Sequence, residues 1–182
     1  MTDKLLGWYY QNKRDLPWRK TKNPYLIWVS EIILQQTQIK TGLNYYQRFI
    51  EKFPTVKSLS IASEIEVLSI WQGLGYYNRA LNMLISAKMV MKQYNGIFPI
   101  KYNHLIQLKG IGEYTASAIS SICANEKKAV VDGNVYRFLS RLYNIDIPIN
   151  TNQGKKEFQK IADKMLPNKN SGTYNQAIME FG

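Results

Sequence analysis

The chain has 182 residues, 45% of them hydrophobic, and a formal net charge of +11 at pH 7. This length suffices for a buried core in one domain or two small lobes. No apolar run approaches the roughly 20 residues of a transmembrane helix, which argues against a membrane protein. The single cysteine and the absence of an apolar signal segment favour the reducing cytoplasm. The charge favours a polyanionic partner, although a solvated lysine-rich face is the alternative.

Helix signals recur along the whole chain, whereas strand-like alternation is confined to residues 128–131 and 145–149. The predicted fold class is therefore all-α. Asn23 followed by Pro24 is typical of an N-cap and a first helical residue, and it predicts a helix that ends near Leu34.

Later helix starts carry similar local signals. Ser63 and Glu66 have the spacing of a capping box, in which each side chain accepts a hydrogen bond from a backbone N–H of the other residue. We expect Asn78 to cap the following helix and Gly96 to end it. Further helices are predicted over 38–52, from Asn103, and after Asp132, Thr151 and Ser171.

The segment Leu108-Lys109-Gly110-Ile111-Gly112 has the pattern of a helix-hairpin-helix. Gly110 and Gly112 permit a tight turn with positive φ, and the backbone N–H groups of such a turn can bind a phosphate. Phosphate contacts carry no base sequence information, which suits a protein that scans any DNA. An ordinary turn between helices is the alternative, and the net charge favours the DNA-binding interpretation.

Two acidic residues are candidates for catalysis. Glu31 interrupts a helix that is apolar on nearly every side, where desolvation would raise its pKa and make it an acid near neutral pH. The alternative is that Ser30 and Glu31 form a narrow polar strip on a buried helix. Asp132 sits at a helix start, where aspartate is also a preferred N-cap. Cleavage of an N-glycosidic bond uses two such groups, one to protonate the base and one to stabilise the cationic sugar.

Six blocks of sequence are more specific than the hairpin alone. They are residues 16–19, 28–38, 71–80, 108–118, 131–135 and 174–177. Together these blocks resemble the adenine-specific mismatch DNA glycosylases of the MutY type, within the helix-hairpin-helix superfamily, over nearly the whole chain. The resemblance implies two helical lobes with the active-site cleft between them. Residues 23–130 would form a helical barrel with the hairpin, and residues 1–22 plus 131–182 would form the second lobe.

The resemblance also implies an activity, the hydrolysis of the N-glycosidic bond of adenine mispaired with 8-oxoguanine or guanine. The adenine would flip out of the duplex, Glu31 would protonate its N7, and Asp132 would stabilise the sugar from across the cleft. Tyr114 and Asn134 would hold this pair in place. Bifunctional relatives carry a lysine at the position of Tyr114 and form a Schiff base with it. The tyrosine therefore implies a monofunctional enzyme that leaves an abasic site.

The residues expected to bind substrate and DNA follow from the same resemblance. Leu34, Gln36 and Tyr76 match positions that enter the base stack at the lesion, and Gly110 and Gly112 belong to the hairpin. The adenine pocket would be lined by Arg14, Trp18, Arg19 and Gln176. The expected partner is double-stranded DNA that contains a mispaired adenine. We expect a monomer without membrane association, acting on the nucleoid in a bacterial cytoplasm.

The sequence departs from the family pattern at two places. Lys109 stands where the family usually has proline. The family continues past the position of Gly182 into four cysteines that hold a 4Fe–4S cluster and then into a domain that recognises 8-oxoguanine. We therefore expect no metal and no cofactor within residues 1–182.

Three alternatives remain open at this point. A mismatch thymine or uracil glycosylase of the same superfamily is the nearest, although a pyrimidine leaving group has less use for protonation by Glu31. A DNA-binding remnant without catalytic activity is the second alternative. An RNA-binding helical protein is the third, and the absence of an aromatic RNA-binding motif argues against it.

Overall fold

The structure is a computed structural model that describes residues 2–182. These residues form helices joined by turns, with no β-strand among them, so the all-α prediction is confirmed. The strand-like segments 128–131 and 145–149 are irregular. In the first of them, the side chain of Asn175 pairs with Val130 N and Lys128 O, the backbone groups that a neighbouring strand would otherwise bind.

The chain divides into two compact units. The hairpin unit is Leu16–Thr115, and the split unit joins the N-terminal segment up to Asp15 with Ala116–Gly182. This division differs from the lobe boundaries that the family resemblance implied, which fell after residues 22 and 130. Helix α8 (Glu113–Ala124) begins in the hairpin unit and continues in the split unit.

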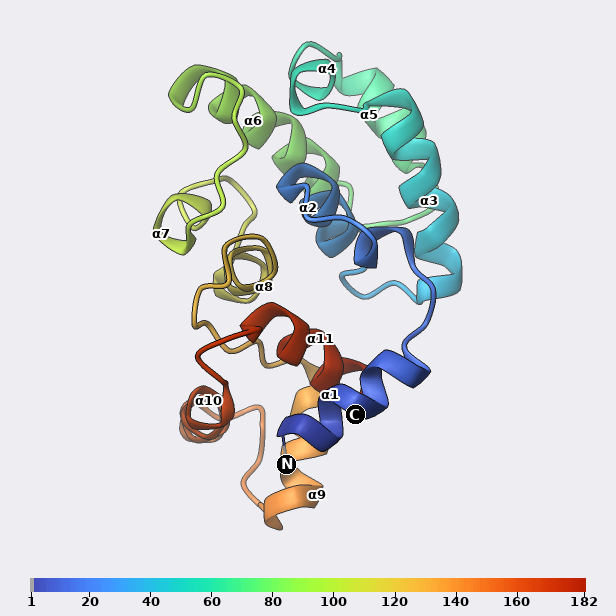
Figure 1. The fold of residues 1–182 in the computed structure, drawn as a ribbon. Helices are drawn as coiled ribbons and strands as arrows, with labels where there is room; N and C mark the ends of the chain where they lie inside the picture. The colour runs from blue at the N-terminus through green and yellow to red at the C-terminus, as the bar shows by residue number, and fades with distance from the viewer. Residues whose placement is uncertain (1) are drawn as a thin grey trace. The chain divides into compact units, whose positions relative to one another are not determined.

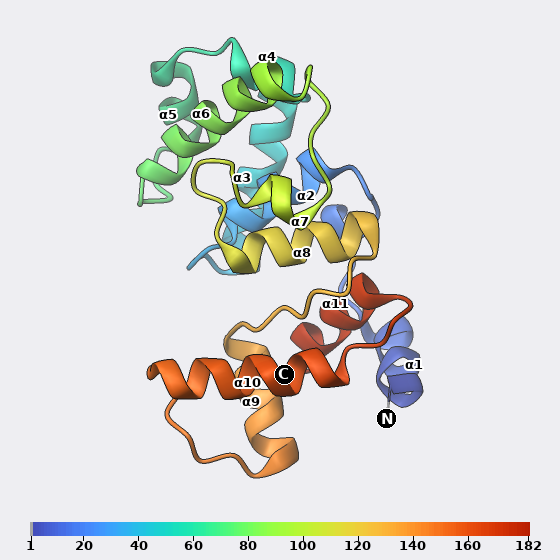
Figure 2. The same ribbon diagram turned by 90° about the vertical axis from the view of Figure 1, so that its left-hand side faces the viewer.

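The hairpin unit is built from helices that enclose an aromatic core. Within it, α3 lies against α2 and α5, and α6 lies against α4 and α5 (Figures 1 and 2). Trp28, Phe49 and Trp71 are almost fully buried, and the rings of Phe49 and Trp71 meet edge to face with centroids 6.0 Å apart. The elements are η1 (Pro17–Arg19), α2 (Pro24–Ile33), α3 (Ile39–Lys52), α4 (Val56–Ser60), α5 (Glu64–Trp71), α6 (Asn78–Gln93) and α7 (Tyr102–Leu105).

Two of the predicted helix starts in this unit are confirmed. Asn23 Oδ1 accepts a hydrogen bond from Tyr25 N at 3.0 Å, and Ser63 and Glu66 form the capping box.

The prediction that Asn78 caps a helix is wrong. The N-cap of α6 is Tyr77, and Asn78 is the first helical residue. A turn that begins at Tyr76, whose carbonyl accepts the N–H of Arg79, already provides a backbone acceptor at this end of the helix.

The split unit packs α1 (Thr2–Asn12) beside α11 (Ser171–Phe181), and α9 (Gly133–Tyr143) against α10 (Asn152–Met165) and α11 (Figures 1 and 2). Helices α9 and α10 begin after Asp132 and Thr151 as predicted, and these two residues are their N-caps. Helix α11 begins at Ser171 itself, because the Ser171 hydroxyl bonds Asn125 and Glu126 instead of capping the helix. Eleven buried residues form the core: Leu5, Tyr9, Ala129, Val135, Leu139, Phe158, Ala162, Leu166, Tyr174, Ala177 and Ile178.

Candidate active site and DNA interface

Glu31 is the one residue between Ile27 and Ile33 that is not fully buried. Within this stretch of the apolar helix α2, only the acidic residue Glu31 is therefore partly exposed. Ser30 is not exposed beside it. Ser30 is 1% exposed, and its hydroxyl donates to Ile27 O at 2.7 Å. The polar-strip interpretation of Ser30 and Glu31 is thus wrong for Ser30, and Glu31 stays the candidate acid.

The carboxylate of Asp132 is held at both oxygens. Oδ1 accepts the backbone N–H of Val135 at 2.9 Å, and Oδ2 accepts Asn134 Nδ2 at 2.9 Å. The Asn134 amide is oriented in turn, since its Oδ1 accepts Arg137 Nη2 at 2.7 Å. Arg137 Nε also donates to Gly182 O at 2.7 Å. The structure therefore brings Asp132 and Asn134 together as an oriented anion at the start of α9, where the helix dipole favours negative charge.

Asn175 positions the segment that leads into Asp132, a role that the sequence analysis missed. The side chain is 2% exposed, and its Oδ1 accepts Val130 N at 3.2 Å. Its Nδ2 donates to Lys128 O at 2.8 Å and to Ser121 Oγ at 3.0 Å. The signal available in the sequence was an asparagine directly after Tyr174 and two residues before Ala177, and only the structure shows that all three positions are buried.

Two predicted pocket residues lie at helix α11 within the split unit, since Gln176 belongs to this helix and Arg14 contacts it. The Arg14 guanidinium donates to the Glu180 carboxylate from Nε at 2.8 Å and from Nη2 at 2.5 Å, and these hydrogen bonds raise the pKa of Arg14. The Tyr9 hydroxyl donates to Gln176 Oε1 at 3.2 Å. Both side chains are held by neighbours in the fold, and their contact with adenine stays a prediction.

The other two predicted pocket residues belong to the hairpin unit. Trp18 is 7% exposed, and its ring meets that of Tyr46 edge to face with centroids 5.1 Å apart. Arg19 is the last residue of η1 and is partly exposed. Trp18 thus contributes to the packing of the unit, and its contact with adenine also stays a prediction.

Ser86 of α6 anchors the predicted hairpin through its hydroxyl, which donates to Lys109 O at 2.7 Å. Gly110 adopts a φ of 78°, as expected, and a Cβ there would lie 2.9 Å from Asn82 Cβ. The expectation of positive φ is wrong for Gly112, which lies at the end of the turn, directly before α8. The amides of both exposed glycines have no hydrogen-bond partner within residues 2–182, so they are available to an acceptor such as a phosphate.

Tyr114 lies in the first turn of α8 and is partly exposed. It follows the hairpin directly, so its position depends on the same turn.

Two turns of the hairpin unit carry the residues expected to enter the base stack. Leu34 is the C-cap of α2, and Gly42 of α3 leaves room for it, because a Cβ at Gly42 would lie 2.7 Å from Leu34 Cδ2. Gln36 and Tyr76 have positive φ values of 58° and 48°, and Tyr76 is 68% exposed. Such conformations are uncommon for these residue types and often occur at functional sites.

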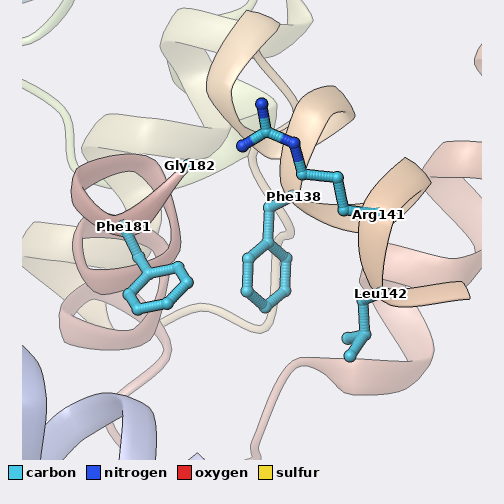
Figure 3. Close-up of a pocket in the computed structure, with 5 residues that line it drawn as sticks. All are labelled: Phe138, Arg141, Leu142, Phe181 and Gly182. Atoms are coloured by element: carbon cyan, nitrogen blue, oxygen red, sulfur yellow. The ribbon is translucent and has the colours of Figure 1, made fainter.

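A pocket in the split unit lies outside this set of residues. Phe138, Arg141 and Leu142 of α9 line it together with Phe181 and Gly182 (Figure 3). None of the predicted site residues lines this pocket, and we assign no role to it.

No group of three or more His, Cys, Asp or Glu side chains within residues 2–182 is arranged to hold a metal ion. A 4Fe–4S cluster needs several thiolates, and Cys123 is the single cysteine of the sequence, so the residues present do not fit such a cluster. None of the described helices is both long and apolar enough to cross a membrane.

Comparisons with curated proteins find relatives that match nearly the whole sequence. The adenine DNA glycosylase of Buchnera aphidicola subsp. Acyrthosiphon pisum is 43% identical over 179 residues, which cover 98% of this chain and 51% of that protein. The adenine DNA glycosylase of Arabidopsis thaliana is 42% identical over 204 residues, which cover 98% of this chain and 32% of that protein. The chain thus spans about half the length, or less, of these curated relatives.

A structural comparison and a family comparison identify the fold and the family of the chain. The structure of a thermostable thymine-DNA glycosylase matches with a TM-score of 0.88 at 26% identity, covering 99% of this chain and 83% of that chain. The model of the HhH-GPD superfamily of base excision DNA repair proteins matches residues 29–167, well over half of the sequence. This protein therefore belongs to the HhH-GPD superfamily of base excision DNA repair proteins.

Proposed function

We propose that this chain is the catalytic core of an adenine DNA glycosylase, which removes adenine mispaired with 8-oxoguanine or guanine. The names of the relatives with 42–43% identity support adenine as the excised base. The observation that carries the proposal is the fixed carboxylate of Asp132, whose two oxygens are oriented by Val135 N and Asn134 Nδ2. A preorganised anion of this kind stabilises positive charge that develops in a transition state.

In the proposed reaction, Glu31 donates a proton to N7 of adenine as the bond between N9 and the sugar C1′ breaks. The bonding electrons leave with the base, and the sugar acquires oxocarbenium character that Asp132 stabilises. Water then adds at C1′ and releases a proton to the solvent, from which Glu31 regains its own, and an abasic site is left. Tyr114 has no amine, so it cannot form a Schiff base with the sugar, and the strand stays intact.

The hairpin supports DNA as the partner. Its exposed Gly110 and Gly112 amides are available to a phosphate, and the chain carries a net charge of +11. These contacts would hold any duplex, because phosphate contacts position the protein and base contacts specify the sequence.

A second candidate is a thymine glycosylase, which the structural match to a thymine-DNA glycosylase favours. The two candidates differ in the base released, and they differ in how much they need protonation by Glu31.

The test is single-turnover excision with Glu31→Gln on a duplex that carries adenine opposite guanine. We expect duplex binding at the wild-type level and excision reduced by about 100-fold or more, the usual scale of general acid catalysis. Glu64→Gln is the matched control, because Glu64 is an exposed glutamate at the start of α5 in the same unit. Excision by Glu31→Gln near the wild-type rate would refute the assignment of the acid.

A further inference from the structure

The turns that carry Gln36 and Tyr76 hold both residues in the left-handed region, with φ values of 58° and 48°. For residues other than glycine such conformations are unfavourable, and they persist where surrounding contacts over-determine them. The two turns are far apart in sequence, since one follows α2 and the other follows α5. A side chain that fixes both turns would therefore have to reach from one turn to the other.

Arg79, the second residue of α6, has that side chain. Its Nη1 donates to Ile32 O at 2.9 Å and to Gln35 O at 2.7 Å, and its Nη2 donates to Gly75 O at 3.2 Å. Longer contacts reach Ile33 O at 3.4 Å and Leu74 O at 3.5 Å. One guanidinium thus joins the C-terminal end of α2 to the turn that precedes α6.

Two of these carbonyls belong to the peptide units that determine the strained angles. The Gln35 carbonyl is in the same planar peptide unit as the nitrogen of Gln36, and the Gly75 carbonyl shares its plane with the nitrogen of Tyr76. The orientation of each plane relative to the following Cα sets φ of the following residue. By holding these two carbonyls, Arg79 acts directly on the φ values of Gln36 and Tyr76.

The environment of Arg79 matches a structural cation rather than a ligand of phosphate. Within residues 2–182 no carboxylate pairs with it, and its Nε is buried without a hydrogen-bond partner. Its guanidinium carbon lies 5.2 Å from the Trp71 ring centroid and 5.7 Å from that of Tyr76. Partial burial lowers the pKa of Arg79 by desolvation. The carbonyls that end α2 have no partners within the helix and carry partial negative charge, which compensates the cation.

We propose that Arg79 is the positioning residue that presents Gln36 and Tyr76 together to the DNA base stack. The inference deepens the proposed function and rests on it. A lysine cannot replace this arginine, because a single ammonium lacks the planar fork that reaches both turns at once.

The experiment compares Arg79→Lys, which keeps the charge, with Lys88→Met, which removes a charge from an exposed position of the same helix. The probe is a duplex with 2-aminopurine in place of adenine opposite guanine, because its fluorescence rises when the base leaves the stack. We expect Arg79→Lys to reduce the rise in 2-aminopurine fluorescence. We also expect it to slow the excision of adenine from the adenine–guanine duplex by about 10-fold or more at saturating enzyme. Lys88→Met should retain both signals. Affinity for an undamaged duplex should change less than about twofold in Arg79→Lys, since phosphate contacts are retained.

A double-mutant cycle separates positioning from general stabilisation. In a background with Gln36→Ala and Tyr76→Ala, the effect of Arg79→Lys on unstacking should disappear, because the side chains it positions are gone. An equal effect in both backgrounds would overturn the proposal. Loss of the helical circular dichroism of Arg79→Lys at the assay temperature would also overturn it, since Arg79 would then stabilise the fold as a whole.

The fluorescence signal also keeps this inference distinct from the proposed function. A wild-type chain that unstacks 2-aminopurine but releases no adenine would refute the glycosylase assignment alone, and the comparison of Arg79 variants would still be decided by fluorescence. A wild-type chain that unstacks no base would overturn the role of Gln36 and Tyr76 and, with it, the inference about Arg79.

Discussion

The two glycines of the hairpin, Gly110 and Gly112, should respond in opposite ways to the same substitution. A Cβ at Gly110 would lie 2.9 Å from Asn82 Cβ, and the backbone there has a φ of 78°. A left-handed conformation costs an alanine roughly 1–2 kcal/mol, and the close approach to Asn82 adds to that cost. At Gly112 the added Cβ meets nothing within 4 Å, and φ is not positive.

We therefore expect Gly110→Ala to lower the free energy of unfolding by about 2 kcal/mol, which corresponds to a fall of about 4–8 °C in Tm for a chain of this size. Gly112→Ala should leave Tm unchanged or raise it slightly, because alanine reduces the entropy of the unfolded chain. Its methyl group would lie beside the exposed amide where we propose a phosphate binds. Gly112→Ala should therefore weaken duplex binding without a loss of stability.

The assay is thermal unfolding followed by circular dichroism, paired with a duplex-binding titration at one fixed salt concentration. Equal losses of Tm in Gly110→Ala and Gly112→Ala would refute the geometry assigned to the turn. Unchanged duplex affinity of Gly112→Ala would refute the phosphate contact while leaving the turn geometry intact.

Two further predictions concern Tyr114 and Leu34. The wild-type chain should form no covalent adduct with DNA under borohydride, whereas Tyr114→Lys should gain one; efficient trapping by the wild type would show that another amine attacks the sugar. Gly42→Ala should displace the flexible end of Leu34, 2.7 Å from the new Cβ, while the alanine raises helix propensity in α3 by up to about 1 kcal/mol. We expect an unchanged or higher Tm with excision slowed by roughly 10-fold, and an unchanged excision rate would argue against a role for Leu34 in the base stack.

Local signals in the sequence were sufficient for much of the helical framework. Asn23 and the pair Ser63 and Glu66 cap their helices as predicted, because a cap depends on residues within one turn of each other. Asn78 has the same local signal but does not cap α6, since the turn that begins at Tyr76 already supplies a backbone acceptor there. Helix α1 was not predicted. Its buried Leu5 and Tyr9 pack in the split-unit core with residues near the other end of the chain.

The residues that position the site through hydrogen bonds, Arg79 and Asn175, could not be predicted from local sequence. Arg79 contacts carbonyls 44 to 47 residues earlier, and Asn175 bonds a segment 45 to 47 residues earlier. No local periodicity encodes such contacts, because they exist only after the helices have packed. The roles of Glu31 and Asp132 came from the family resemblance, and the structure adds the hydrogen bonds that orient Asp132.

The central claim is that the chain releases adenine from a mispair, and base release on matched duplexes tests it most directly. Three duplexes would carry adenine opposite 8-oxoguanine, adenine opposite guanine, or thymine opposite guanine, with alkali added afterwards to reveal abasic sites. We predict alkali-dependent cleavage at adenine in the first two duplexes and none at thymine in the third, with no strand cleavage before alkali. Cleavage at thymine alone, or no abasic site in any duplex at low salt and high enzyme concentration, would contradict the proposed function.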